Sequence, residues 1–176
     1  MRPIRLLAWG LIVLLLLFAA ASYAGLPEQI PTKVGLDGKM VRMAAKSLGG
    51  WFLLPLIALA VHLLMAVVSA LIPSRPHLFN FPAKARFLSL PSEFQGPVIV
   101  EMQTMLDIVM VGTNALMLVI QFQLWRTALG QHSPGMMIAI LIVPVLLTPL
   151  MFLRLSRITT VLEQEEKRWK ASGTSP

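Results

Sequence analysis

Residues Ile99–Leu124 read IVEMQTMLDIVMVGTNALMLVIQFQL, an apolar run that polar side chains interrupt at regular intervals. A helix of this length can cross the hydrocarbon core of a bilayer, which is roughly 30 Å thick. The polar side chains recur 4, 7 and 7 residues apart, on one face of a helix: Gln103, Asp107, Asn114 and Gln121. Because polar groups at membrane depth need partners, the pattern predicts an inner helix whose polar stripe faces protein or water.

Three further apolar stretches accompany this one, and 56% of all 176 residues are hydrophobic. The mean hydropathy of +0.75 also exceeds that of ordinary soluble domains. We therefore predict an all-α fold, an integral membrane four-helix bundle with an ordered outward loop, in a single membrane domain of residues 1–170. The expected elements are helices at about 6–23, 51–72, 99–124 and 135–153, a juxtamembrane helix at 154–170 and a disordered tail at 171–176.

The first stretch allows two interpretations. Arg2 and Arg5 before an apolar run, with Ser22, Tyr23 and Ala24 after it, are also typical of a cleaved secretory signal. The run is long for a signal core, which favours a retained anchor helix.

The net charge of +7 is assigned to membrane topology and not to nucleic-acid binding, since no basic patch with interleaved aromatic residues occurs. With four spans, ten basic residues fall on the side of the two termini and five on the other side. The positive-inside rule then places both termini in the cytoplasm and loop 24–50 outside. The expected partners are the lipid bilayer and a protein partner or homo-oligomer, with no nucleic acid.

The residues that usually carry catalysis or bind metals form no set in this sequence. The chain has no cysteine, and its three histidines lie on different segments. Glu101 and Asp107 are six residues apart and point to different faces of a helix. No Ser/His/Asp set, metal motif or phosphate loop is present. We expect no enzyme activity, no cofactor and no metal.

Matching depths in the bilayer predicts one contact between helices. His62 lies near the middle of its stretch and Asn114 near the middle of the next, whereas Asp107 lies about two turns away from Asn114. We expect His62 to contact Asn114 more readily than Asp107. These groups have two interpretations, as hydrogen bonds that join helices or as a proton or ion relay, and the first is favoured.

The two long loops differ in character. In loop 24–50, Pro27 and Pro31 favour an extended start, Gly35 and Asp37-Gly38 favour tight turns, and Lys39–Ser47 is expected to form a short helix. In loop 74–98, four prolines argue against one long helix, and phenylalanines interleaved with Lys84 and Arg86 are typical of a segment in the headgroup region.

Loop 24–50 resembles the hallmark of a bacterial membrane family called domain of unknown function 1648. Family members carry Leu-Pro-x-x-Ile-Pro-Thr-His after the first membrane helix, then a Gly-rich turn, a Lys and a Leu-Pro. The residues that match here are Leu26, Pro27, Ile30, Pro31, Thr32, Gly35, Gly38, Lys46, Leu54 and Pro55. A weaker second motif matches Asn80, Pro82, Lys84, Leu90 and Pro91. The usual histidine is Lys33 here, so a metal or proton role of that histidine does not carry over.

The resemblance implies a domain similar to the N-terminal membrane part of immunity proteins against a sporulation-delaying toxin. Immunity or signalling is therefore an analogy for this chain. We predict a small non-enzymatic protein with a binding, sensing or accessory-subunit role; the alternative is an oligomeric transporter or channel component that uses the polar stripe. The expected binding residues are Leu26, Pro27, Ile30, Pro31, Thr32, Lys33, Gly35, Gly38 and Lys46, and the intramembrane polar set is His62, Gln103, Asp107, Asn114 and Gln121.

Overall fold

The structure, a computed structural model, describes residues 2–35, 40–131 and 134–173. Four long helices dominate this part of the chain, and each is long and apolar enough to span a membrane. The prediction of an all-α membrane bundle is confirmed, with a small sheet added. In chain order the elements are α1 (Pro3–Tyr23), β1 (Gln29–Val34), β2 (Met40–Ala45), α2 (Leu48–Leu71), the 3-10 turn η1 (Pro76–Leu78), α3 (Lys84–Ser89), α4 (Ser92–Ala128) and α5 (Pro134–Ala171).

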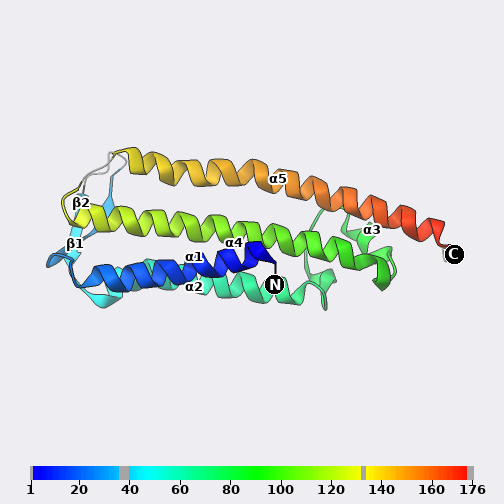
Figure 1. Cartoon of the computed structure of the whole chain (residues 1–176), viewed down its shortest axis with the longest axis horizontal. Helices are drawn as coiled ribbons and strands as arrows, with labels where there is room; N and C mark the ends of the chain where they lie inside the picture. The colour runs from blue at the N-terminus through cyan, green and yellow to red at the C-terminus, as the bar shows by residue number, and fades with distance from the viewer. Residues whose placement is uncertain (1, 36–39, 132–133, 174–176) are drawn as a thin grey trace.

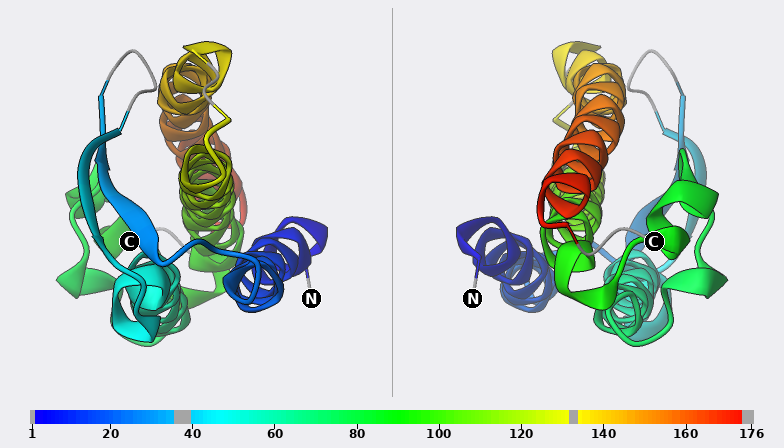
Figure 2. Two further views of the ribbon diagram at one scale, coloured as in Figure 1. Left: turned by 90° about the vertical axis from the view of Figure 1, so that its left-hand side faces the viewer. Right: turned by 90° about the vertical axis from the view of Figure 1, so that its right-hand side faces the viewer.

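Helix α4 is the centre of the molecule. Helices α1 and α2 lie along one side of it and α5 along the other, as both the long view (Figure 1) and the end views (Figure 2) show. The β1–β2 hairpin lies at one end of the bundle, and η1 and α3 lie toward the other end, where the chain terminates. The predicted inner helix is therefore the one that contacts all the others.

Helices α4 and α5 are longer than the bilayer requires. Their 37 and 38 residues correspond to about 55 Å each at 1.5 Å per residue, against about 31 Å for the 21 residues of α1. The excess extends past the N-terminal end of α1 (Figure 1). There α4 begins seven residues earlier than predicted, because Pro97 falls in its second turn, where a proline costs few hydrogen bonds. Helix α5 continues without a break through the expected juxtamembrane helix.

The excess length of α4 and α5 forms a lobe together with η1 and α3. Its core holds Phe87 and Leu90 against Val98, Ile158 and Leu162. Loop 74–98 thus packs part of its apolar surface against α4 and α5, while Leu78 and Leu88 stay exposed. Of the expected disordered tail, Ser172 and Gly173 follow α5 as a turn, and residues 174–176 lie outside the described residues.

The short helix expected for residues 39–47 is wrong, because residues Met40–Ala45 form strand β2. This strand pairs antiparallel with β1, with Ile30 opposite Ala44 and an irregular register after Pro31. A helix of about nine residues is marginal in isolation, whereas pairing with β1 satisfies the backbone of both segments at once. The predicted turn residue Gly38 lies outside the described residues.

Candidate functional site

The polar stripe of α4 faces α1 and α2 and forms what we call the polar seam: His62, Ser69, Gln103, Asp107, Asn114 and Gln121, together with Arg2 and Arg5. Asp107 and Gln121 are fully buried, and His62 and Asn114 are 1% exposed. The stripe therefore faces protein along its length, as predicted for an inner helix.

The predicted contact between His62 and Asn114 is confirmed. The Asn114 side-chain amide donates to the Ala8 carbonyl oxygen at 2.9 Å and to His62 Nδ1 at 2.9 Å. Since a carbonyl can only accept, the group facing both partners is the NH₂ of Asn114, and Nδ1 of His62 is an acceptor. The ring proton then resides on Nε2. Trp9 packs edge-on against the imidazole, with 4.3 Å between ring centroids. One amide thus joins α1, α2 and α4.

Asp107 has different partners, which the sequence analysis missed. Arg5 Nε donates to its Oδ1 at 3.0 Å, and Arg2 Nη1 lies 3.8 Å from its Oδ2. Arg5 also donates to the Ser69 hydroxyl of α2 at 2.7 Å. The two arginines were interpreted as a topology signal and as part of a possible secretory signal. Helices α1 and α4 run in the same direction, and Asp107 precedes Asn114 as Arg5 precedes Ala8, so the contact of Asn114 with Ala8 also brings Asp107 near Arg5.

The remaining stripe residues also bond to α1 or α2. Gln103 accepts from Arg2 and donates to the Ser69 carbonyl at 2.8 Å. Arg2 reaches the Val100 carbonyl as well, at 2.8 Å. At the other end of the seam, Gln121 donates to the Trp51 carbonyl at 3.4 Å. Each predicted intramembrane polar residue therefore connects two helices.

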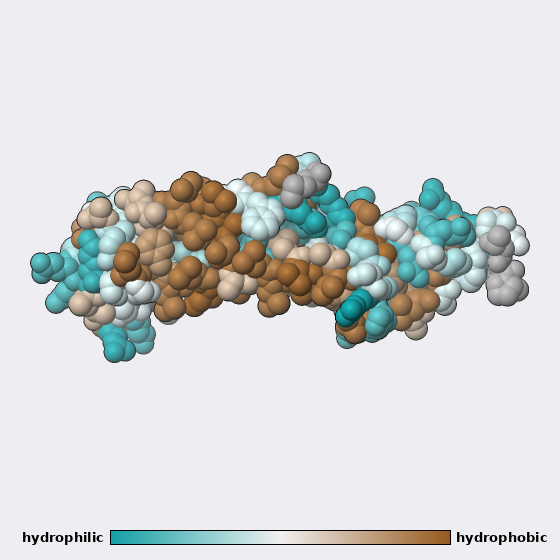
Figure 3. Space-filling view, turned by 90° about the horizontal axis from the view of Figure 1, so that it is seen from below, coloured by the Kyte–Doolittle hydropathy of each residue, from teal (hydrophilic) through white to brown (hydrophobic). Residues whose placement is uncertain are grey.

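On its opposite face α4 carries Glu101, which accepts from Arg154 at 3.2 Å and lies 3.1 Å from Arg157 Nε. Glu101 and Asp107 do point to different faces, toward α5 and α1. Together they form a charged collar: Arg2, Arg5, Glu101, Asp107, Arg154 and Arg157. In Figure 3 the apolar band between the hairpin and this region ends in hydrophilic surface. The collar thus marks one boundary of the membrane-spanning part.

The loop motif mainly attaches the hairpin to the helices. Leu26 and Ile30 are buried against Ala19 and Trp51, and the Trp51 indole donates to the Ala19 carbonyl at 2.9 Å. Lys46 donates to the carbonyls that follow α1, at 3.0 Å to Leu26, and its ammonium lies 4.8 Å from the Tyr23 ring centroid. Pro31 is also buried.

The other motif residues are less enclosed. Pro27, Thr32 and Lys33 are exposed, and Gly35 is half-buried. The Thr32 hydroxyl donates across the hairpin to the Arg42 carbonyl at 3.4 Å. Of the predicted binding residues, those that are buried hold the fold and those that are exposed remain available to a partner.

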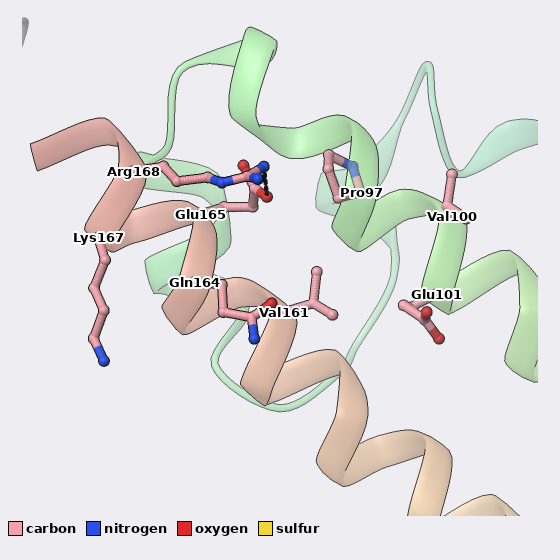
Figure 4. Close-up of a pocket in the computed structure, with 8 residues that line it drawn as sticks. All are labelled: Pro97, Val100, Glu101, Val161, Gln164, Glu165, Lys167 and Arg168. Atoms are coloured by element: carbon pink, nitrogen blue, oxygen red, sulfur yellow. Dashed lines mark hydrogen bonds and ion pairs between the residues drawn. The ribbon is translucent and has the colours of Figure 1, made fainter. Parts of the chain in front are cut away.

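A hollow of about 570 Å³ lies in the lobe between the start of α4 and the end of α5 (Figure 4). Glu165 and Arg168 pair across its wall at 3.0 Å, and Lys167 points away from it. Nearby, Arg86 of α3 forms an exposed ion pair with Glu166 of α5, with 2.6 Å between Nη2 and Oε2. This hydrogen bond lowers the pKa of the Glu166 carboxyl and raises the pKa of Arg86. The Arg86–Glu166 pair joins α3 to α5, whereas Glu165 and Arg168 pair within α5.

A comparison with known families finds a match, which includes the loop. Residues 10–59 match the family model described as domain of unknown function (DUF1648). The chain carries a DUF1648 domain. The match covers most of α1, the hairpin and the first half of α2, so it contains the hydrogen bonds of the Trp51 indole and of Lys46, whereas the α4 residues that contact Trp51 lie outside it. The second motif, at residues 80–91, lies beyond the match. No curated protein and no solved structure matches the chain.

The ion pair of Asp107 and Arg5 should be strongly coupled. Removing one partner leaves a charge in a setting of low dielectric, so Asp107→Asn and Arg5→Gln should each lower the free energy of unfolding by about 1–3 kcal/mol. The double variant should lose less than the sum, with a coupling energy of about 1–2 kcal/mol in reversible unfolding in micelles. The matched cycle of Arg86→Gln and Glu166→Gln should give under about 1 kcal/mol, because that pair is exposed. Additive losses at Asp107 and Arg5 would contradict the described pairing.

A second test compares two lysines of the DUF1648 motif, one that attaches the hairpin to α1 and one that is exposed. Lys46→Met removes hydrogen bonds to two carbonyls, and such charged hydrogen bonds each contribute about 1.5–3 kcal/mol. Hydrogen exchange of the β1 amides should become at least ten-fold faster in this variant. Lys33→Met, which changes an exposed side chain, should leave the exchange rates unchanged. Equal effects of the two variants would show that Lys46 does not attach the hairpin.

Proposed function

We propose that this protein is a small non-enzymatic polytopic protein of the bacterial inner membrane that binds or senses a partner at its outer face, or serves there as an accessory subunit. The observation that carries the proposal is the construction of the hairpin. Its motif residues Leu26 and Ile30 are buried against α1 and α2, and Lys46 bonds to the end of α1, so the hairpin is a fixed platform and not a tether.

Strand β2 supplies the binding surface of this platform. Val41 is 60% exposed and Met43 37%, and the two side chains share one face of the strand. Strand β1 contacts α4, whereas the far edge of β2 has no neighbouring strand among the described residues. An exposed sheet edge can pair with an extended segment of another chain, with side chains on the strand giving specificity.

The charges of the hairpin indicate what such a segment would carry. Lys33 lies opposite Arg42 in the register, so two exposed cations lie side by side on the hairpin, between Val41 and Met43 in the strand but on its other face. An acidic or neutral segment is compatible with this pair, and a basic one is not. On the predicted topology, with both termini in the cytoplasm, the segment would approach from outside the cell.

The alternative is an oligomeric transporter or channel component, which would use the two buried ionisable groups Asp107 and His62. The geometry supports it less. Each of the two groups is held by its own partners, Arg5 and Asn114, and the bonds run between helices. Proton or ion flux in vesicles containing the purified protein, lost on Asp107→Asn, would favour this alternative.

Site-specific photocross-linking in living cells tests the binding role. A benzoylphenylalanine at Val41 or at Met43 should give the same discrete protein adduct, because both positions lie on one exposed face. The matched control is Leu88, an exposed residue at the lobe end, 42% exposed, which should not give that adduct. Arg42→Glu should reduce the adduct severalfold through charge repulsion. Identical products from Val41 and Leu88, or no protein adduct at either strand position, would contradict the proposal.

A further inference from the structure

An apolar groove of about 260 Å³ runs between α4 and α5, with Ile4 of α1 at its edge. Ile108 and Gly112 of α4 form one wall, and Val143, Leu147 and Leu150 of α5 form the other. A Cβ atom on Gly112 would lie 2.7 Å from both methyl carbons of Leu147, so the glycine is what lets this leucine enter the wall. Every lining side chain is aliphatic.

The groove faces the hydrocarbon of the bilayer. In this half of the molecule α4 is the main neighbour of α5, and the α5 side chains Leu141 and Val145, together with the lining residue Leu146, are 61–68% exposed. Since the surrounding solvent at this depth is lipid, hydrocarbon chains are what can fill the groove.

One end of the groove opens on the charged collar. Thr104 lies one helical turn before Ile108 on α4, and Arg154 lies one turn after Leu150 on α5, so both continue the walls of the groove. Arg2 donates to the Thr104 hydroxyl at 3.0 Å, and Arg154 reaches across to Glu101 at 3.2 Å. Cationic side chains therefore flank the point where the aliphatic lining ends.

The collar carries excess positive charge. Its four arginines face two carboxylates, Asp107 and Glu101, which leaves two positive charges unbalanced. Arg157 is 61% exposed even while it touches Glu101, so its guanidinium can bind an anion as well. Arginine is well suited to a phosphate because its planar fork binds two oxygens at once.

We propose that the groove and the collar form a site for one anionic phospholipid, with an acyl chain between α4 and α5 and the phosphate at Arg2, Arg154 and Arg157. On the predicted topology the lipid belongs to the inner leaflet. The site is independent of the hairpin and of the proposed binding role. An aliphatic groove that leads directly to the cations fits the acyl chain and the phosphate of one lipid. A free inorganic phosphate has no acyl chain to fill the groove.

Native mass spectrometry of the full chain, extracted in mild detergent and offered equal amounts of phosphatidylglycerol and phosphatidylcholine, tests the headgroup. The protein should retain phosphatidylglycerol preferentially. Arg157→Gln should lower the ratio of the two retained lipids about five-fold, the effect of one arginine near an anionic surface. The matched control is Arg168→Gln, which removes an arginine of α5 that is 72% exposed and pairs with Glu165 of its own helix. This control should leave the ratio unchanged. Equal retention of the two lipids, or equal effects of the two variants, would overturn the proposal.

A second pair of variants tests the groove. Leu150→Trp fills it and should reduce retention of both lipids, whereas Leu153→Trp, three residues on and 66% exposed outside the lining, should not. Val143→Phe fills the same groove from its other end and replaces Leu150→Trp if that variant does not fold. Retention that survives groove filling but is displaced by inorganic phosphate would mean an anion site without an acyl site, and would overturn the proposal.

Discussion

The arrangement of the bundle depends on one constraint: the polar stripe of α4 must find hydrogen-bond partners in a medium that offers none. Asn114 meets that need by bonding to Ala8 and His62, and Asp107 does so by pairing with Arg5. Both sets of bonds involve α1 and α2, so they fix the rotation of α4 and the depth of its two neighbours together. Among the described residues of α5 none is hydrogen-bonded to the stripe, and α5 is held instead by close packing at Gly112 and by the ion pairs of Glu101.

This constraint also indicates where function is to be sought. Each residue of the stripe has a side-chain hydrogen bond to a neighbouring helix, although His62 Nε2, Asp107 Oδ2 and Gln121 Oε1 have no hydrogen-bond partner among the described residues. The surfaces that fit other molecules lie at the two ends of the membrane span. At the hairpin end, the buried Ile30 and the half-buried Lys46 of the DUF1648 motif hold β2 in an exposed position. At the collar end, excess arginine charge lies next to an aliphatic groove. The protein thus presents one surface suited to a polypeptide and one suited to a lipid.

Much of this could be predicted from the sequence, because apolar runs and helical spacing report directly on membrane helices. The inner position of α4 and the contact between His62 and Asn114 both follow from such spacing. The strand at residues 40–45 was not predicted, since its short pattern does not by itself distinguish a strand from a helix and its backbone partner is another segment, β1. The pairing of Arg5 with Asp107 was missed because the spacing along one helix does not tell which neighbouring helix its polar residues face, and Arg5 lies on a different segment. The motif predicted that loop 24–50 is ordered, but it did not predict which of its residues are buried and which are exposed.

The most direct test of the central claim is the ¹⁵N spectrum of His62 in lipid bilayers, recorded by solid-state NMR in a His77→Asn, His132→Asn background. If Asn114 donates to Nδ1, the ring is a single neutral tautomer with its proton on Nε2, and that proton exchanges slowly with deuterated buffer because the residue is 1% exposed. Replacing Asn114 by Leu should remove the signature of a hydrogen-bonded Nδ1. A positively charged ring at neutral pH, or rapid exchange with water, would contradict the account, since it would mean that the seam is a hydrated path and not a set of bonds between helices.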